Sequence, residues 1–249
     1  MQNQIRNLRD RRKHLGFNNT NHRAVPPQLE TELFSVRHAI FSRLTVLISS
    51  QNLGPCWHDT LKLALNNGIT MFQIEECILH LGIYVGFPKS LQCFMELKNL
   101  GFSTSLSHLA MNSELKLASE GVPKQVPDQF NFFQQPDIQV ALHNIHPDFG
   151  WLAGTTASAL CARGGLTPLE RAHITLMSDI CQNVFKGPFQ IHVRMVLQCA
   201  GTEKFMQSAI AHLIDLTHEH EDFAIPVKNL FKADELLPIA ISEHRSFLS

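Results

Sequence analysis

A glutamate and a histidine that could transfer protons lie within the apolar run from Ala64 to Pro88. Glu76 stands one helical turn before His80, and Tyr84, the only tyrosine of the chain, follows later in the same run. On one face of a helix, Glu76 could act as a base in a dry pocket, with the Tyr84 hydroxyl anchoring a substrate. The alternative is a packed core, in which Glu76 pairs with the His80 ring and Tyr84 bonds a backbone carbonyl. The spacing alone leaves both interpretations open.

A second reactive group is the thiol of Cys56, two residues before His58. A helix is expected to begin near Trp57, and a thiol at the amino end of a helix beside an imidazole is favoured as the thiolate. Cys56 is therefore a candidate nucleophile or redox thiol, and a small buried hydrophobic residue is the alternative. The six cysteines include no C-x-x-C pair and no zinc-like spacing, so we predict no metal site.

Helices must position these groups, because apolar residues recur at intervals of three and four along the first hundred residues. The pattern predicts helices over about 30–50, 57–66, 70–86 and 89–100. Asn67 and Gly68 tolerate the left-handed conformation that closes the second helix, and Thr70 is placed to cap the third. No segment alternates as a strand would, so the sequence predicts an all-α fold.

The same order of helices and breaks recurs in the second half of the chain. Gly54-Pro55 corresponds to Gly187-Pro188, and His80 corresponds to His212. Both histidines lie in apolar helices, as core groups or as substrate-binding groups. Two such copies are expected to fold as one pseudo-symmetric unit. The predicted organisation is a basic amino-terminal arm (1–28), a first repeat (29–105), a linker with prolines (106–136), a second repeat (137–232) and a carboxy-terminal tail (233–249).

The run from Ala64 to Pro88 resembles the signature of the carboxymuconolactone decarboxylase family, which includes the alkyl hydroperoxidase D proteins. The matching residues are "ALNNGIT" at 64–70, Ile74, Glu76, "HL" at 80–81, Tyr84 and "GFP" at 86–88. A more divergent second match comes from "LTPLER" and "GPFQIHVRM". The resemblance implies two tandem helical repeats of this family in one chain. It also implies assembly around a three-fold axis, so that three such chains would form a trimer resembling a hexamer.

The resemblance also implies site residues. In the peroxidase branch of the family, activity rests on a C-x-x-C pair, a following histidine and an upstream glutamate, whereas the decarboxylase branch uses a histidine with an acidic partner. Cys56 takes the place of the second redox cysteine, but Leu53 stands where the first would be. His192 matches the histidine in the second repeat and Glu170 the upstream glutamate, while His58 is the nearest candidate in the first repeat. A histidine that only caps or packs at a helix start is the alternative for His192.

Acid-base chemistry on a small organic acid is therefore the first functional hypothesis, as decarboxylation or as isomerisation of a lactone or keto acid. His192 and Glu170 form its proton-transfer pair, because an unperturbed imidazole titrates near neutral pH. Thiol-dependent peroxide reduction by Cys56 and a non-catalytic oligomeric relative remain as alternatives. No motif indicates a cofactor, and the 14 histidines lack the spacing of a metal site.

Composition limits the partners. The chain has 21 Lys and Arg against 22 Asp and Glu, a formal net charge of -1, which gives no global field to recruit nucleic acid or an anionic membrane. No apolar stretch approaches the roughly 20 residues that span a bilayer, and no secretory signal pattern is present. The sequence therefore predicts a cytoplasmic homo-oligomer with a small-molecule substrate, and no nucleic-acid or membrane partner.

Overall fold

The computed structural model describes residues 34–102 and 132–248, with side chains as far as His244. The described part of the chain is 81% helical, contains ten α-helices and has no strand, which confirms the predicted all-α fold class. None of the helices described there is long and apolar enough to cross a membrane.

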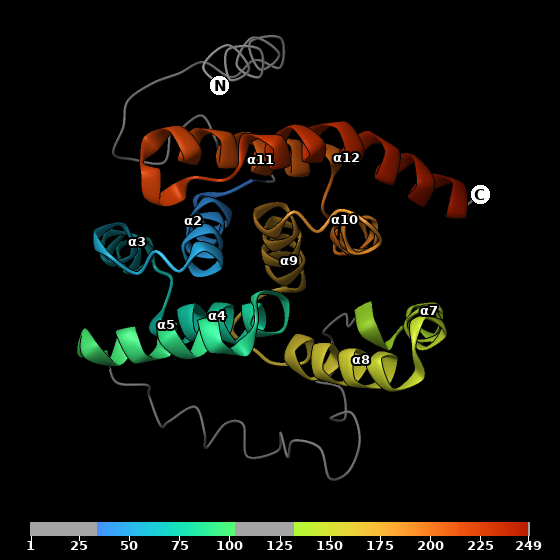
Figure 1. Cartoon of the computed structure of the whole chain (residues 1–249), viewed down its shortest axis with the longest axis horizontal. Helices are drawn as coiled ribbons and strands as arrows, with labels where there is room; N and C mark the ends of the chain where they lie inside the picture. Colours follow the sequence, from blue (N-terminus) through green and yellow to red (C-terminus); the bar gives the residue numbers. More distant parts are fainter. Residues whose placement is uncertain (1–33, 103–131, 249) are drawn as a thin grey trace.

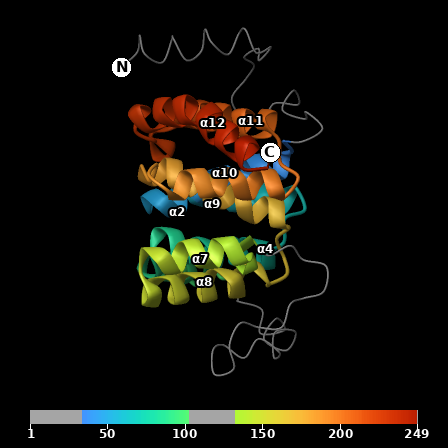
Figure 2. The ribbon, with the colours of Figure 1, turned by 90° about the vertical axis from the view of Figure 1, so that its right-hand side faces the viewer.

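The helices stack in three layers, which Figures 1 and 2 show from two directions. The middle layer consists of α2 (Val36–Ser50), α3 (Pro55–Asn66), α9 (Pro168–Gln182) and α10 (Pro188–Gln198). One outer layer consists of α11 (Glu203–Glu219) and α12 (Val227–Leu248). The other consists of α4 (Met71–Val85), α5 (Phe87–Asn99), α7 (Pro136–Ile145) and α8 (Pro147–Cys161).

Helices α2 and α9 form the centre of the molecule. All eleven residues from Glu170 to Ile180 are buried, so α9 is enclosed on every side and not only along one stripe. That enclosed stretch includes six polar or charged residues, which must find hydrogen-bond partners inside the protein. The functional candidates described below are among them.

The four helices predicted in the first half are confirmed as α2, α3, α4 and α5. Thr70 caps α4 as expected: its side chain accepts a hydrogen bond from the backbone N–H of Gln73 at 3.3 Å. Gly68 has a positive φ of 75°, which closes the turn before α4 without strain. Gly86, with φ of 98°, separates α4 from α5 in the same way.

Helix order in the second half follows that of the first. Helices α2, α3 and α4 begin at residues 36, 55 and 71, and α9, α10 and α11 begin at 168, 188 and 203. The offsets are 168 − 36 = 132, 188 − 55 = 133 and 203 − 71 = 132. This order agrees with the predicted duplication, but helix order alone does not establish internal symmetry, so the pseudo-symmetric unit stays a prediction.

Other predicted segments lie partly outside the described residues. The basic arm (1–28) and residues 106–131 of the linker are outside them. Residues 132–134 form a short 3-10 helix, η2 (Phe132–Gln134), with both phenylalanines buried. Helices α7 and α8 were not predicted individually. The expected tail from residue 233 continues α12, because Ala233, Leu237, Ala240 and Ile241 follow a helical period that Pro238 obscures in the sequence.

Candidate active site between helices α4, α9 and α10

Helices α4 and α9 pack together through polar residues spaced four apart on each helix. These residues are Glu76, His80 and Tyr84 on α4, and Arg171, Thr175 and Asp179 on α9. Residues four apart project from the same side of a helix, so the two rows can meet along their length. The resulting polar strip runs between the middle layer and the outer layer of α4.

At one end of the strip, Glu76 binds two arginines. Arg163 donates from Nε and Nη2 to both carboxylate oxygens at 2.5–3.0 Å, and Arg171 donates from Nη2 at 3.1 Å. Only 1% of the Glu76 side chain and 1% of the Arg171 side chain is exposed. Each charge has therefore lost its contact with water and is stabilised by the opposite charge of the other. Arg171 also donates to the backbone carbonyls of Arg163 and Gly164, which fixes its plane.

Gly165 allows the chain to pass close to this cluster. Its φ is +90°, and an added Cβ would lie 2.9 Å from the Phe72 ring and 3.0 Å from Cγ of Glu76. Any other residue would combine backbone strain with a clash at this point. The turn between α8 and α9 can therefore bring Arg163 onto Glu76 only because residue 165 is glycine.

In the middle of the strip, His80 is a buried neutral imidazole. Its Nε2 lies 2.8 Å from Oγ1 of Thr175, and its Nδ1 lies 3.5 Å from Nη1 of Arg171. A guanidinium can only donate, so Nδ1 accepts and the proton resides on Nε2, which donates to Thr175. Burial lowers the pKa of His80 well below its usual value, and the charge of Arg171 lowers it further. This histidine is held in one tautomer by its neighbours.

At the other end, Asp179 and His192 form a dyad. Nδ1 of His192 lies 2.6 Å from Oδ2 of Asp179, and the side chains are 8% and 5% exposed. Burial raises the pKa of Asp179, while the adjacent His192 opposes that rise. With Nδ1–H donated to the carboxylate, the lone pair of Nε2 is left as a proton acceptor, and no described residue forms a hydrogen bond with it. This is the arrangement by which a carboxylate orients a general base.

Tyr84 joins the two histidines. Its ring lies 5.3 Å from the ring of His80 and meets the ring of His192 edge-on at 5.6 Å, both measured between centroids. The hydroxyl is buried near Thr175, outside hydrogen-bonding geometry, and no described residue is its partner. Burial raises the pKa of Tyr84 well above its usual value, so the phenol stays protonated and can donate to a bound group.

The predicted pair of His192 and Glu170 is not brought together. Glu170 accepts from Arg37 Nε at 2.9 Å and from the backbone N–H of Thr167 at 2.8 Å, so it completes the cap of α9. Asp179 is the carboxylate that contacts His192. Nine residues separate Glu170 from Asp179, which is about 13 Å along a helix that rises 1.5 Å per residue. Because α10 folds back against α9, its histidine meets the far end of α9.

The other predicted residues lie away from this dyad. His58 contacts Oε1 of Glu96 at 3.3 Å, and Cys56 lies beside Asp222. Burial, followed by the hydrogen bond and the charge of Asp222, raises the pKa of Cys56 to about 11, which disfavours the thiolate. His212 lies on α11, where its Nε2 donates to the carbonyl of Ala39 at 3.2 Å. Of the predicted residues, the structure therefore gathers only Glu76, His80, Tyr84 and His192 along the polar strip.

Sequence reasoning missed Asp179 and Thr175. The signal was present, since Arg171, Thr175 and Asp179 recur every fourth residue inside an apolar helix. Polar residues that share one face of a buried helix must meet polar partners. That rule, applied to α9, would have selected Asp179 as the carboxylate that faces a neighbouring helix.

A separate hollow of about 230 Å³ lies between α7 and α10, lined mostly by apolar side chains with Asp137 and Arg194 at its edge. Neither Asp179 nor His192 lines it, so the hollow and the dyad are different features.

The geometry therefore provides an imidazole with a free lone pair, a carboxylate that orients it and a phenol beside both. These groups suit the transfer of a proton near neutral pH. Comparison with known proteins adds no constraint to that chemistry: no model of a known protein family matches the chain, and no curated protein matches its sequence.

Proposed function

We propose that this protein is an acid-base enzyme that transfers a proton on a small organic acid, by decarboxylation or by isomerisation of a lactone or keto acid, as the family resemblance suggests. The observation that carries the proposal is the 2.6 Å contact between Nδ1 of His192 and Oδ2 of Asp179, with both side chains nearly enclosed. A structural histidine at a helix start needs no buried carboxylate, whereas a carboxylate that accepts from Nδ1 fixes the tautomer in which Nε2 acts as a general base.

Each neighbour of the dyad has a role in this reaction. Nε2 of His192 accepts or donates the proton, and Asp179 holds the ring and stabilises its charged form. The Tyr84 hydroxyl, which lacks a partner among the described residues, is available to donate to an oxygen of the substrate. At the other end of the strip, two guanidiniums and one carboxylate leave a formal charge of 2 − 1 = +1. The Asp179 carboxylate offsets that charge while His192 is neutral, so the strip carries a net positive charge, which favours an anionic substrate, when His192 is protonated.

Replacement of His192 by glutamine should lower turnover by about 10²-fold or more, because positioned acid-base groups contribute roughly 10² to 10⁴ in rate. The assay is a screen of small lactones, keto acids and dicarboxylates, with proton exchange at carbon followed by NMR. Asp179→Asn should show a loss of the same order. The exposed His143, changed to glutamine, is the matched control and should retain full turnover. Equal activity of His192→Gln and the parent protein would exclude this mechanism.

The same screen, with a peroxide-reduction assay added, distinguishes the two alternatives. A thiol peroxidase would lose peroxide reduction in Cys56→Ser and be unaffected by His192→Gln, but a thiol with a pKa of about 11 is a weak nucleophile near neutral pH. A non-catalytic relative would show no turnover with any substrate. Either result would contradict the role that we assign to the dyad.

We also propose that the protein is a homo-oligomer, with a trimer expected from the family resemblance. Phe87, Leu91 and Met95 are 66%, 61% and 58% exposed and recur every fourth residue along α5. An apolar stripe of this kind is typical of an interface between protein chains.

The apolar stripe on α5 predicts that the protein is an oligomer in solution. Mass measurement at micromolar concentration should give a trimer, and Leu91→Glu should shift it toward the monomer, because a charge would be buried without a partner. Leu65→Glu, on α3 and 38% exposed, is the control and should leave the mass unchanged. A parent protein that is monomeric under these conditions would contradict the proposal.

A further inference from the structure

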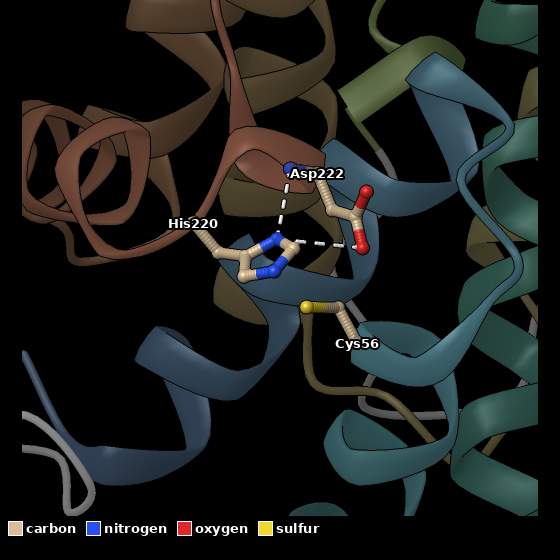
Figure 3. A group of neighbouring side chains, drawn as sticks. All are labelled: Cys56, His220 and Asp222. Carbon is tan, nitrogen blue, oxygen red and sulfur yellow. Dashed lines mark hydrogen bonds and ion pairs between the residues drawn. The ribbon is translucent and has the colours of Figure 1, made fainter.

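Three side chains outside the polar strip offer ligand atoms to a common point. They are Cys56, His220 and Asp222, whose sulfur, imidazole nitrogen and carboxylate oxygen all lie within 4.8 Å of one another. Figure 3 shows the thiol, the ring and the carboxylate directed toward a shared space. Cys56 comes from the first turn of α3, and the other two come from the corner between α11 and α12, so the group joins segments far apart in sequence.

The backbone holds these residues in place. His220 ends α11 and begins the short 3-10 helix η3 (Glu221–Phe223), and its Nδ1 accepts from the backbone N–H of Asp222 at 3.1 Å. The side-chain amide of Asn52 donates to the backbone carbonyl of Asp222 at 2.9 Å, which ties the corner to the loop before α3. The ligand atoms are therefore brought together by protein contacts that involve no ion.

A pair of charged residues supports the same corner from the other side. Arg43 binds Glu219 through two hydrogen bonds of 2.6 and 3.0 Å, and its guanidinium lies 4.5 Å from the centroid of the Phe223 ring. Because Arg43 is paired with Glu219, its positive charge is balanced locally and does not neutralise the Asp222 carboxylate. The negative charge of the cluster is left for another cation.

The distances and the donor types fit a divalent cation with affinity for sulfur. Nδ1 of His220 lies 3.5 Å from Oδ2 of Asp222. Two ligand atoms bound at about 2.0–2.1 Å to a tetrahedral Zn²⁺ lie about 3.3 Å apart, so the observed separation is close to that of a bound pair. The lone pair of Nδ1 accepts from the backbone N–H of Asp222 in the structure, so a cation that binds Nδ1 would take the place of that hydrogen bond.

The electrostatics of the cluster favour the same occupant. A thiolate and a carboxylate together carry a charge of about −2, which a divalent cation would balance. A bound metal ion removes the proton of the thiol, because a coordinating thiol is deprotonated outright.

We propose that Cys56, His220 and Asp222 form a binding site for a thiophilic divalent cation of the Zn²⁺ class, with water in the fourth position. Zinc binds cysteine sulfur, histidine nitrogen and carboxylate oxygen, and sites with three protein ligands keep a fourth position open. The site links the start of α3 to the corner between α11 and α12. It is independent of the dyad on α9 and α10, and neither proposal needs the other.

Cobalt titration of the reduced, chelator-treated full-length protein tests the site. Co²⁺ should produce a near-ultraviolet charge-transfer band from thiolate to metal, together with the visible bands of a tetrahedral ion, and Zn²⁺ should displace it. Cys56→Ser should abolish the charge-transfer band. His220→Gln and Asp222→Asn should weaken Co²⁺ binding by at least about tenfold, since even residues that only support a metal ligand are worth roughly 10–100-fold.

Matched variants separate this site from other metal-binding groups in the chain. Cys199→Ser changes another half-buried cysteine, and His143→Gln another exposed histidine, and both should bind Co²⁺ as the parent does. Circular dichroism checks that each variant is folded, and the exposed position of His220 makes its variant the safest if Cys56→Ser does not fold. The proposal is overturned if no charge-transfer band forms, or if the band and the affinity survive changes at Cys56 and His220.

Discussion

Replacement of Glu76 by glutamine should lower the free energy of unfolding by about 3–5 kcal/mol, the usual cost of breaking a buried ion pair by removing one partner. Glutamine keeps the shape and one acceptor oxygen but removes the charge that Arg163 and Arg171 share. Arg171 is 1% exposed and would remain as a buried cation without a carboxylate partner. The effect should therefore be much larger than that of an exposed pair.

Urea unfolding of the parent and the variant measures this difference. Glu96→Gln is the control, because the Glu96 side chain is 26% exposed and contacts His58 and Asn99 near the surface, so its loss should cost less than about 1 kcal/mol. Exchange of both Glu76 and Arg171 for methionine should recover part of the loss, because the fully buried charge is then absent and only the partly exposed Arg163 is left without its carboxylate. If Glu76→Gln were as stable as Glu96→Gln, the cluster would not contribute to the stability of the fold.

Acidification from about pH 7 to about pH 5 should also destabilise the protein strongly, because several histidines are buried in neutral form. His212 shows the size of the effect: burial, followed by the charge of Arg43, lowers its pKa from 6.5 to about 4. Burial also lowers the pKa values of His80 and His173 well below 6.5, so three groups act in the same direction.

The direction follows from which state binds the proton. Above pH 6.5, His212 is neutral in the folded and in the unfolded protein. Below pH 6.5, the unfolded chain binds a proton at His212 that the folded protein does not bind. Stability therefore falls as pH falls, down to the folded value of about 4. At about pH 5, about 1.5 units below the unfolded pKa, His212 alone should cost about 2 kcal/mol.

Urea unfolding at the two pH values tests the prediction. The informative quantity is the change in stability between them, since His212→Gln can alter absolute stability while keeping the hydrogen bond to Ala39. That variant should show a smaller change than the parent, and the exposed His143→Gln should show the same change as the parent. Equal stability of the parent protein at both pH values would contradict the assignment of neutral buried histidines.

The sequence predicted the helices well because a helix cap, a turn glycine and an apolar period each depend only on residues close together in the chain. Thr70 caps α4, Gly68 ends the preceding turn, and the apolar period of α2 needs no knowledge of its neighbours. The pairing of side chains across helices could not be read in the same way. Glu170 was chosen for His192 because it lies upstream in sequence, but the antiparallel packing of α9 and α10 selects Asp179. That choice depends on helix register, which the sequence of either helix alone does not specify.

The second candidate site shows the same limit. His58 is two residues from Cys56 but faces Glu96, whereas His220 and Asp222 reach the thiol from more than 160 positions away. Spacing rules for metal ligands search for neighbours in sequence, so they could not find this group. The family resemblance, in turn, suggested a helical repeat, but the partner that it implied for His192 was Glu170, whereas the structure pairs His192 with Asp179.

The crossing of helices between the two halves has a consequence for synthesis of the chain. Helix α4, from the first half, packs against α9, and α11 packs against α2, so His80 bonds Thr175 while His212 bonds Ala39. These contacts join residues 95 and 173 positions apart. Until the ribosome has made the second half, the polar face of α4 has no partner, so the first half cannot complete its packing. The chain therefore completes its fold only after nearly all of it has been translated.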